Sequence, residues 1–442
     1  MKIGIISLGC DKNRVDTECI LAMLKAGGYE IESDIERCDI MIVNTCAFIE
    51  RARVEAIDTI LETAEFKKKN LKKLIVTGCL PQKYSAEIFE ELYEVDAFVG
   101  INAYGQICKI LEKVLNGQRL VVLDNESQVC VKNFERVLTT PNHYAYLKIA
   151  DGCNNACSYC TIPSIRGKYR SRPLGELKKE CEFLNNQNIK EIILVAQDVT
   201  RYGIDLYDEY KIVGLIREIS KFQNIKKIRL MYCYPELVTD ELIDEIKNND
   251  KVCKYIDIPF QHVSDKILKA MRRRSTYKST IDLIEKLRNQ IKDISIRSTF
   301  ITGFPGETDN DFNLLYNFIK TYKLENVGFF TYSKEEGTLS AKLQGAVPEP
   351  IKEARYDKLF KLQSEIIFEK NKEKVGKTLQ VVCDGIDFEK KMFFGRSMYE
   401  APDIDTIIYL EGKCEINQGE LYNVKVIGYD GFDLYASIIE TI

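Results

Sequence analysis

The chain has 442 residues, enough for about three domains and a well-buried core. Its apolar share of 45% and charged share of 29% exclude an intrinsically disordered, collagen-like or mainly membrane-embedded protein. The formal net charge of −4 gives no overall attraction for nucleic acid. Residues 1–8 lack the features of a secretory leader, and no stretch approaches the ~20 apolar residues of a membrane helix. We therefore expect a cytoplasmic protein with no membrane partner.

Residues 1–135 alternate between short apolar runs and segments with a helical period. Strands are expected at residues 3–8, 40–44, 74–77, 96–100 and 120–123, and helices at 15–26, 52–66, 86–93 and 104–116. This alternation predicts an α/β domain with a doubly wound parallel sheet.

Residues 139–371 repeat the strand–helix alternation six times. The strands are expected at residues 145–149, 191–196, 227–232, 255–258, 295–302 and 327–332, and a long polar helix at 353–374 leaves the unit. Six such repeats predict a partial (β/α) barrel of the triose-phosphate-isomerase kind, with its site at the carboxyl ends of the strands.

Residues 372–442 change to short runs with a period of two, broken by Gly, Asp and Asn. These runs lie at residues 379–383, 392–396, 406–410, 422–429 and 434–439. They predict a small antiparallel β-barrel.

The 15 cysteines are too sparse for a disulfide scaffold, so we expect free thiols. Nine of them occur singly and are expected to be buried or inert: Cys19, Cys38, Cys108, Cys130, Cys181, Cys233, Cys253, Cys383 and Cys414. The other six form two groups of three, and their placement carries the functional argument.

The first trio is Cys10, Cys46 and Cys79, each placed immediately after a predicted strand. A single cysteine there is better explained as a buried residue that follows a strand by chance. Chance is a weaker explanation for three cysteines at equivalent strand ends, because the carboxyl ends of parallel strands meet at one sheet edge, where ligands bind. The first trio therefore indicates a shared metal site, and both a zinc ion and an iron–sulfur cluster remain open.

The second trio is Cys153, Cys157 and Cys160, a CxxxCxxC spacing directly after the strand at 145–149. No fourth cysteine follows closely. Four protein ligands would close a structural zinc site or an electron-transfer cluster, whereas three leave one metal position open. The second trio therefore indicates a reactive centre.

At this spacing the chain resembles the radical S-adenosylmethionine (radical SAM) enzymes. In that family three such cysteines hold a four-iron four-sulfur (4Fe-4S) cluster. Its open iron binds the amino and carboxylate groups of S-adenosylmethionine (SAM), and reductive cleavage then gives a deoxyadenosyl radical. The cofactor thus supplies the hard step for an unactivated C–H bond.

Further motifs are similar to those of the methylthiotransferases, over essentially the whole chain. They lie at residues 7–16 (SLGCDKNRVD), 152–173, 257–262 (DIPFQH), 303–307 (GFPGE) and 401–405 (APDID). The resemblance implies a domain carrying a second 4Fe-4S cluster on the first trio, a radical SAM barrel and a TRAM β-barrel that binds substrate. The second cluster is thought to carry the sulfur, which one SAM methylates before a radical from another activates the substrate carbon.

The motif around Cys10, the Gln261-His262 pair and the segment 401–405 resemble the branch that modifies ribosomal protein S12. Thr17 and Thr406 depart from the usual residues of the family without touching a ligand position. Residues 372–442 carry eight basic and thirteen acidic side chains, a net charge of −5. Because a barrel that follows phosphates should be basic, this charge favours a basic protein substrate.

Other residues at the ends of barrel strands are candidates for the cofactor site. Gly303, Phe304 and Glu307 resemble the family segment that lines the adenosyl group, and Gln197 with Asp198 ends another strand, where polar groups can reach the cofactor. A plain turn and a plain loop are the alternatives.

The basic runs and the two histidines can each be explained without a role in the functional site. The runs are Arg166, Lys168, Arg170 and Arg172, and Arg272, Arg273 and Arg274; they indicate either a solvated face or contacts with the cofactor carboxylate or a ribosomal surface. His262 is expected to be a hydrogen-bonded structural residue, and His143 part of a linker.

The hypothesis is an enzyme that adds a methylthio group to the β-carbon of an aspartate in ribosomal protein S12, using two 4Fe-4S clusters and SAM. Its partners would be S12, free or in the small subunit, an electron donor such as flavodoxin or ferredoxin, and a sulfur donor. The alternatives are methylthiolation of a transfer-RNA adenosine and a two-cluster electron carrier, for which full cysteine ligation would be expected.

Overall fold

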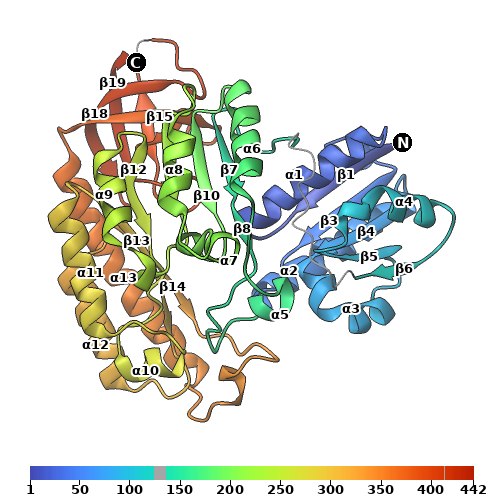
Figure 1. Cartoon of the computed structure of the whole chain (residues 1–442), viewed down its shortest axis with the longest axis horizontal. Helices are drawn as coiled ribbons and strands as arrows, with labels where there is room; N and C mark the ends of the chain where they lie inside the picture. The colour runs from blue at the N-terminus through green and yellow to red at the C-terminus, as the bar shows by residue number, and fades with distance from the viewer. Residues whose placement is uncertain (124–135, 413) are drawn as a thin grey trace.

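The computed structural model describes residues 1–123, 136–412 and 414–442. The first range folds into a six-stranded parallel sheet in the order β2-β1-β3-β4-β5-β6 (Figure 1). Its strands are β1 (Lys2–Ser7), β2 (Glu30–Ile31), β3 (Ile40–Thr45), β4 (Lys73–Gly78), β5 (Ala97–Gly100) and β6 (Leu120–Val122), and its helices are α1 (Asp11–Ala26), α2 (Glu50–Ala64), α3 (Cys79–Glu91) and α4 (Ile107–Leu115). The predicted doubly wound domain is confirmed. The prediction missed β2, because two residues are too few to show a period.

The second range contains an open six-stranded parallel sheet in the order β14-β13-β12-β11-β10-β7. Its strands are β7 (Tyr144–Lys148), β10 (Glu191–Val195), β11 (Lys227–Leu230), β12 (Val252–Asp257), β13 (Ser295–Thr302) and β14 (Asn326–Thr331). All six strands were predicted, and the open sheet confirms the partial barrel. A short hairpin of β8 (Ala150–Asp151) and β9 (Arg170–Ser171) follows β7 and was too short to predict.

The helices between these strands cover the outer face of the sheet (Figure 1). They are α6 (Leu174–Asn186), α8 (Ile212–Ser220), α9 (Asp240–Asn248), α11 (Tyr277–Gln290) and α12 (Asp309–Tyr322), and α13 (Glu349–Lys374) follows β14 and packs beside α12. Of the shorter helices, α5 (Ile162–Arg166) packs on α3 of the N-terminal domain, whereas α7 (Ile204–Tyr207) follows β10 and α10 (Asp265–Ala270) follows β12. Helix α8 shows why they pack there, since Ile212, Leu215, Ile216 and Ile219 recur at helical spacing and are buried. These faces and the sheet form the largest apolar core.

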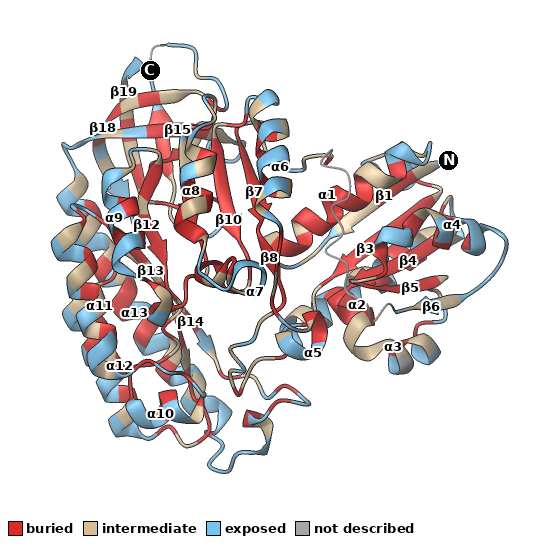
Figure 2. Cartoon of the chain, in the orientation of Figure 1, coloured by how far each residue is buried: buried red, intermediate tan, exposed pale blue. Residues whose placement is uncertain are grey.

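The inner face of the central sheet packs against the N-terminal domain. Tyr146, Val195 and Met231 of the central unit share one apolar cluster with Val15 and Leu24 of α1. Figure 2 shows the strands of both sheets largely buried and the outward helix faces exposed. The N-terminal domain therefore packs against the central sheet through α1.

The C-terminal residues form a closed five-stranded barrel in the order β15-β16-β17-β19-β18. The strands are β15 (Thr378–Asp387), β16 (Met392–Arg396), β17 (Ile408–Glu411), β18 (Leu421–Asp430) and β19 (Asp433–Thr441). Every neighbouring pair is antiparallel as predicted except β17 and β19, which run parallel. A closed ring with an odd number of strands must contain at least one parallel pair.

Buried ion pairs attach this barrel to the central sheet. Glu191 of β10 pairs with Arg396 of β16 and, at 2.8 Å, with Arg229 of β11. His143 was predicted to be a linker residue, but it is buried and its Nε2 lies 2.7 Å from Asp384 Oδ1 of the barrel. The linker interpretation of His143 is wrong, because the side chain is buried in a contact between domains. The sequence did not reveal this contact, since Asp384 lies far along the chain.

The predicted boundary at residue 135 and Cys130 lie outside the described residues. Within the described part, no helix is long and apolar enough to cross a membrane. The fourteen described cysteines are all free thiols, as expected.

Candidate metal centres

The first trio gathers at one sheet edge. Cys10 is the N-cap of α1 and lies three residues after the end of β1, Cys46 directly follows β3, and Cys79 begins α3 directly after β4. In the observed strand order, β1 and β3 flank the point where the winding of the sheet reverses, which is where ligands bind in this class of fold. Gly9, at φ +88°, permits the approach, because a Cβ there would lie 2.6 Å from Cys46 Cβ.

The thiols of the first trio act on one another. Burial raises the pKa of Cys79 to about 12, and the thiolates of Cys46 and Cys10 add to that rise against the opposing charge of Arg166. Burial also raises the pKa of Cys46, with Cys10 as the next cause. Ionisation of any one of the three thiols therefore opposes ionisation of the others.

The second trio lies in the loop between β8 and α5. Cys153 N–H donates to Gly167 O at 3.2 Å, and Cys160 N–H donates to Cys157 O at 3.1 Å. Gly152, at φ +77°, makes the loop possible, because a Cβ there would lie 2.1 Å from the backbone oxygen of Lys168. Burial raises the pKa of Cys160 to about 12 and that of Cys153 to about 11, and the Cys157 thiolate contributes to both rises.

Both trios fit an iron–sulfur cluster by the chemistry of their donors. Each set offers three free thiols, which lose their protons on binding a metal, and the bound cation then offsets the repulsion among the three thiolates. Among the described residues, no group of three His, Cys, Asp or Glu side chains is arranged to hold a single metal ion. A 4Fe-4S cluster does not need that arrangement, because each cysteine binds a different iron.

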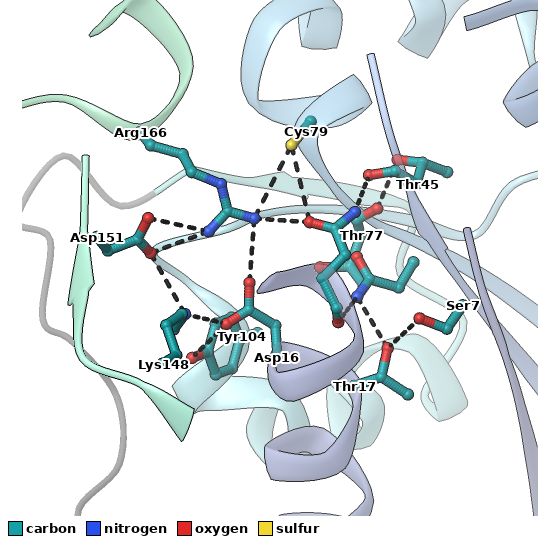
Figure 3. Close-up of polar contacts among 12 residues, drawn as sticks. Ser7, Asp16, Thr17, Thr45, Thr77, Cys79, Tyr104, Lys148, Asp151 and Arg166 are labelled. Carbon is teal, nitrogen blue, oxygen red and sulfur yellow. Dashed lines mark hydrogen bonds and ion pairs between the residues drawn. The ribbon is translucent and has the colours of Figure 1, made fainter. Parts of the chain in front are cut away.

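A buried arginine links Cys79 of the first trio to Asp151, two residues before the second trio (Figure 3). Arg166 Nη1 donates to both carboxylate oxygens of Asp151 at 3.1 and 2.9 Å, and Nη2 contacts Asp16 Oδ2 at 3.1 Å. The same Nη2 donates to Asn13 Oδ1 at 2.6 Å and lies 4.0 Å from Cys79 Sγ. Arg166 therefore links α1 and the first trio to the strand that leads into the second trio.

Lys148 completes this network. Its ammonium pairs with Asp16 and lies 3.3 Å from Asp151 Oδ2. Two buried cations thus face two buried carboxylates, so the node is neutral. Asp151 also accepts from Gly152 N–H at 2.9 Å, which fixes the residue next to Cys153.

The basic runs divide by burial. Arg166, Arg172 and Arg273 are buried, Arg170 is partly buried, and Lys168, Arg272 and Arg274 are exposed. The solvated-face interpretation is wrong for the buried three, because each has partners contributed by distant segments. Arg273 lies 4.0 Å from Cys157 Sγ and stacks on the Tyr234 ring, at 4.1 Å from its centroid.

The candidate cofactor residues lie at the carboxyl ends of β10 and β13. Gln197 Nε2 donates to Asp151 Oδ1 at 3.2 Å, which places Gln197 beside the second trio. Glu307 is buried and accepts from Gly303 N–H at 2.7 Å and from Arg355 at 2.8 Å, so it closes its own turn. Phe304 is fully buried and packs on Tyr332.

Two other polar residues near this site have structural partners. His262 is buried, and its Nδ1 accepts from Ser264 N–H at 3.0 Å, which agrees with the predicted structural role. Asp198 accepts from Asn155 Nδ2 at 2.9 Å and so braces the loop of the second trio.

Sequence reasoning did not single out Lys12, which is buried against the Tyr232 ring. Its position two residues after Cys10 was the available signal. A lysine in the first turn of a helix is normally solvated, so nothing in the sequence distinguished it.

Three family models match the chain. The uncharacterized protein family UPF0004 matches residues 2–100, the radical SAM superfamily 147–319 and the TRAM domain 375–439. Among solved structures, the radical S-adenosylmethionine methyltransferase TsrM from Kitasatospora setae matches with a TM-score of 0.57 and 14% identity, covering 87% of this chain and 79% of its own. The cobalamin-dependent S-adenosylmethionine radical enzyme OxsB matches with a TM-score of 0.52 and 16% identity, covering 84% and 56%. These two structures show a shared fold alone. With the family models, the fold and the second trio define a radical SAM enzyme.

Relatives that match this chain over nearly their whole length show which kind of radical SAM enzyme it resembles. Each of three is a ribosomal protein uS12 methylthiotransferase RimO. The relative from Acetivibrio thermocellus is 46% identical over 445 residues, covering 99% of this chain and 98% of its own. That from Clostridium kluyveri is 46% identical over 442 residues (100% and 98%), and that from Thermoanaerobacter sp. is 44% identical over 432 residues (98% and 98%).

The chain belongs to the family of ribosomal protein uS12 methylthiotransferases. The predicted resemblance is thereby confirmed, and the electron-carrier alternative is excluded. Membership of the radical SAM superfamily implies a 4Fe-4S cluster and SAM as cofactors. The matched ranges do not test the predicted domain boundaries, which stay predictions.

Proposed function

We propose that the protein adds a methylthio group to the β-carbon of an aspartate in ribosomal protein uS12, in the cytoplasm. The observation that carries the proposal is the pair of three-thiol sites joined through the side chains of Arg166 and Asp151. Such a junction suits a reaction in which a radical centre and a sulfur-carrying centre act on one substrate carbon. The family of relatives supports the choice of substrate.

The charge of the C-terminal barrel supports a protein substrate. The net charge of −5 over residues 372–442 repels nucleic-acid phosphates and attracts a basic protein. Ribosomal proteins are generally basic, so the barrel suits uS12 better than transfer RNA. In this proposal the barrel binds the substrate, and the partners are uS12, an electron donor and a sulfur donor.

The six cysteines are the proposed ligands of the two clusters. When bound, a cluster at the second trio with SAM supplies a radical for an unactivated carbon, and a cluster at the first trio supplies the sulfur. The Cys157 sulfur is enclosed by Arg273 and Tyr234, whose contacts exclude water from that side of the trio. Asp151 and Asn155 hold the cysteine loop in place through Arg166 and Asp198.

Gln197 and the turn at residues 303–307 are the proposed contacts to SAM. Gln197 Oε1 is buried and accepts no hydrogen bond from any described residue, which leaves it for an amino or hydroxyl group of the cofactor. Glu307 acts through the turn, because its carboxylate holds Gly303 and Arg355. Phe304 supports the same turn from inside the core.

Anaerobic reconstitution followed by mass spectrometry tests the proposal. The loaded protein should bind about eight irons, because each of its two 4Fe-4S clusters contains four. With SAM, reductant and a sulfide source it should replace one hydrogen on the β-carbon of the target aspartate of uS12 by a methylthio group, and the mass of the peptide should increase accordingly. A peptide of unchanged mass, with both clusters present and SAM cleaved, would refute uS12 as the substrate.

A further inference from the structure

Lys12 is a largely buried lysine whose ammonium group has no counter-ion among the described residues. The residue lies in the first turn of α1, two residues after Cys10, and only 7% of its surface is exposed. No described residue forms a hydrogen bond or an ion pair with its Nζ. Lysine is rarely buried unless it is paired, so this arrangement needs an explanation.

The one partner of the Lys12 ammonium in the described structure is an aromatic face. Nζ lies 3.4 Å from the centroid of the Tyr232 ring. Tyr232 follows β11, at the carboxyl end of the central sheet, where substrates of such barrels bind. Burial raises the pKa of Tyr232, with the charges of Asp11 and Cys10 as the next causes, which places the ring near the first trio.

The surroundings hold Lys12 in position and do not neutralise it. The adjacent carboxylate of Asp11 accepts from the Tyr232 hydroxyl at 3.0 Å, so it fixes the ring on which the ammonium rests. Tyr232 itself adopts a left-handed backbone, at φ +58°, which is uncommon for a bulky residue and costs energy. A cation–π contact compensates a buried cation only in part, so an anion that entered here would be bound favourably.

We propose that Lys12 binds the carboxylate of the substrate aspartate and holds its β-carbon beside the first trio. The inference rests on the proposed function, which supplies an acidic side chain as the reacting group. A fixed positive charge within reach of Cys10 accounts for recognition of aspartate over its uncharged amide. A site built to pair a charge rejects an analogue that lacks it, because the buried partner is left uncompensated.

The test compares uS12 with a uS12 variant in which asparagine replaces the target aspartate. Binding of both proteins to the cluster-free enzyme and modification of both by the loaded enzyme are measured for the parent enzyme, K12M and K12R. The matched control is K25M, because Lys25 lies on the same helix but is exposed. Melting temperatures and iron contents show whether each variant is folded and loaded.

The parent enzyme and K25M should favour the aspartate protein by at least about tenfold in affinity and in kcat/KM, as expected for a buried charge pair. K12M should reduce that preference to within about threefold, and K12R should keep most of it. A purely structural role for Lys12 would change stability and leave the preference intact, and that result overturns the inference. Failure of a fully loaded parent enzyme to modify the aspartate protein refutes the proposed function itself, and this inference with it.

Discussion

Replacement of Arg166 by methionine should weaken the attachment of the N-terminal domain to the central sheet. The loss of stability should exceed that caused by replacing an exposed arginine. Arg166 is 2% exposed and makes charged contacts with Asp151 and Asp16, so methionine leaves two buried carboxylates facing only Lys148. Breaking a buried ion pair by removing one partner costs about 3–5 kcal/mol, because an uncompensated charge remains. We therefore expect R166M to lower the free energy of local unfolding of α1 by about 3–5 kcal/mol.

Native-state hydrogen exchange of α1 in the cluster-free protein measures this free energy directly, without assuming that a multidomain chain unfolds in two states. The double variant R166M/D16N restores the charge balance and should recover at least about 1 kcal/mol of the loss, a coupling expected of contacting residues. The control is R51M, which removes an exposed arginine on α2. The argument is that balanced charge stabilises the buried group formed by Arg166, Lys148 and the two aspartates. It would be refuted if R166M lowered the free energy by less than about 1 kcal/mol, or if the double variant were destabilised further instead of recovering stability.

Three further predictions concern the clusters, the barrel and the turn. Cys46→Ser and Cys157→Ser should each reduce the iron content from about eight to about four per chain, and iron kept at about eight in either variant would contradict the ligand assignment. Burial opposes ionisation of Glu191, but Arg396 and Arg229 outweigh it and lower its pKa from 4.5 to about 2. Its stabilisation of the barrel interface, about 3 kcal/mol, should therefore be complete above pH 4.5 and be lost as the pH falls towards 2; Glu191→Gln should flatten this part of the curve of melting temperature against pH. Phe304→Ala should cost about 3–5 kcal/mol in the free energy of local unfolding of β13, measured by native-state hydrogen exchange, and a loss under about 1 kcal/mol would show that the ring is not a core residue.

The architecture could be predicted because strands, helices and barrel runs carry their own periodicity. The first trio was predictable for the same reason, since parallel strands bring their carboxyl ends to one edge wherever they lie in the chain. The second trio is local in sequence, so its spacing alone indicated a metal site.

The charged interior could not be predicted, because its pairs join residues far apart in the chain. Arg166 and Lys168 are both basic residues of one run, but only Arg166 is buried, and Asp16 on another domain decides this. His143 looked like linker because Asp384 lies 241 positions away. Lys12 is buried by Tyr232, which the sequence places in a different domain.

The shared apolar cluster between α1 and the inner face of the central sheet has a consequence for motion. Val15 and Leu24 on one side and Tyr146 and Met231 on the other would be exposed to water if the two domains parted. Large apolar interfaces suppress hinge movement between domains. The distance between the two trios is therefore fixed when the chain folds. A substrate would bind to a preformed site and would not cause the two domains to close around it.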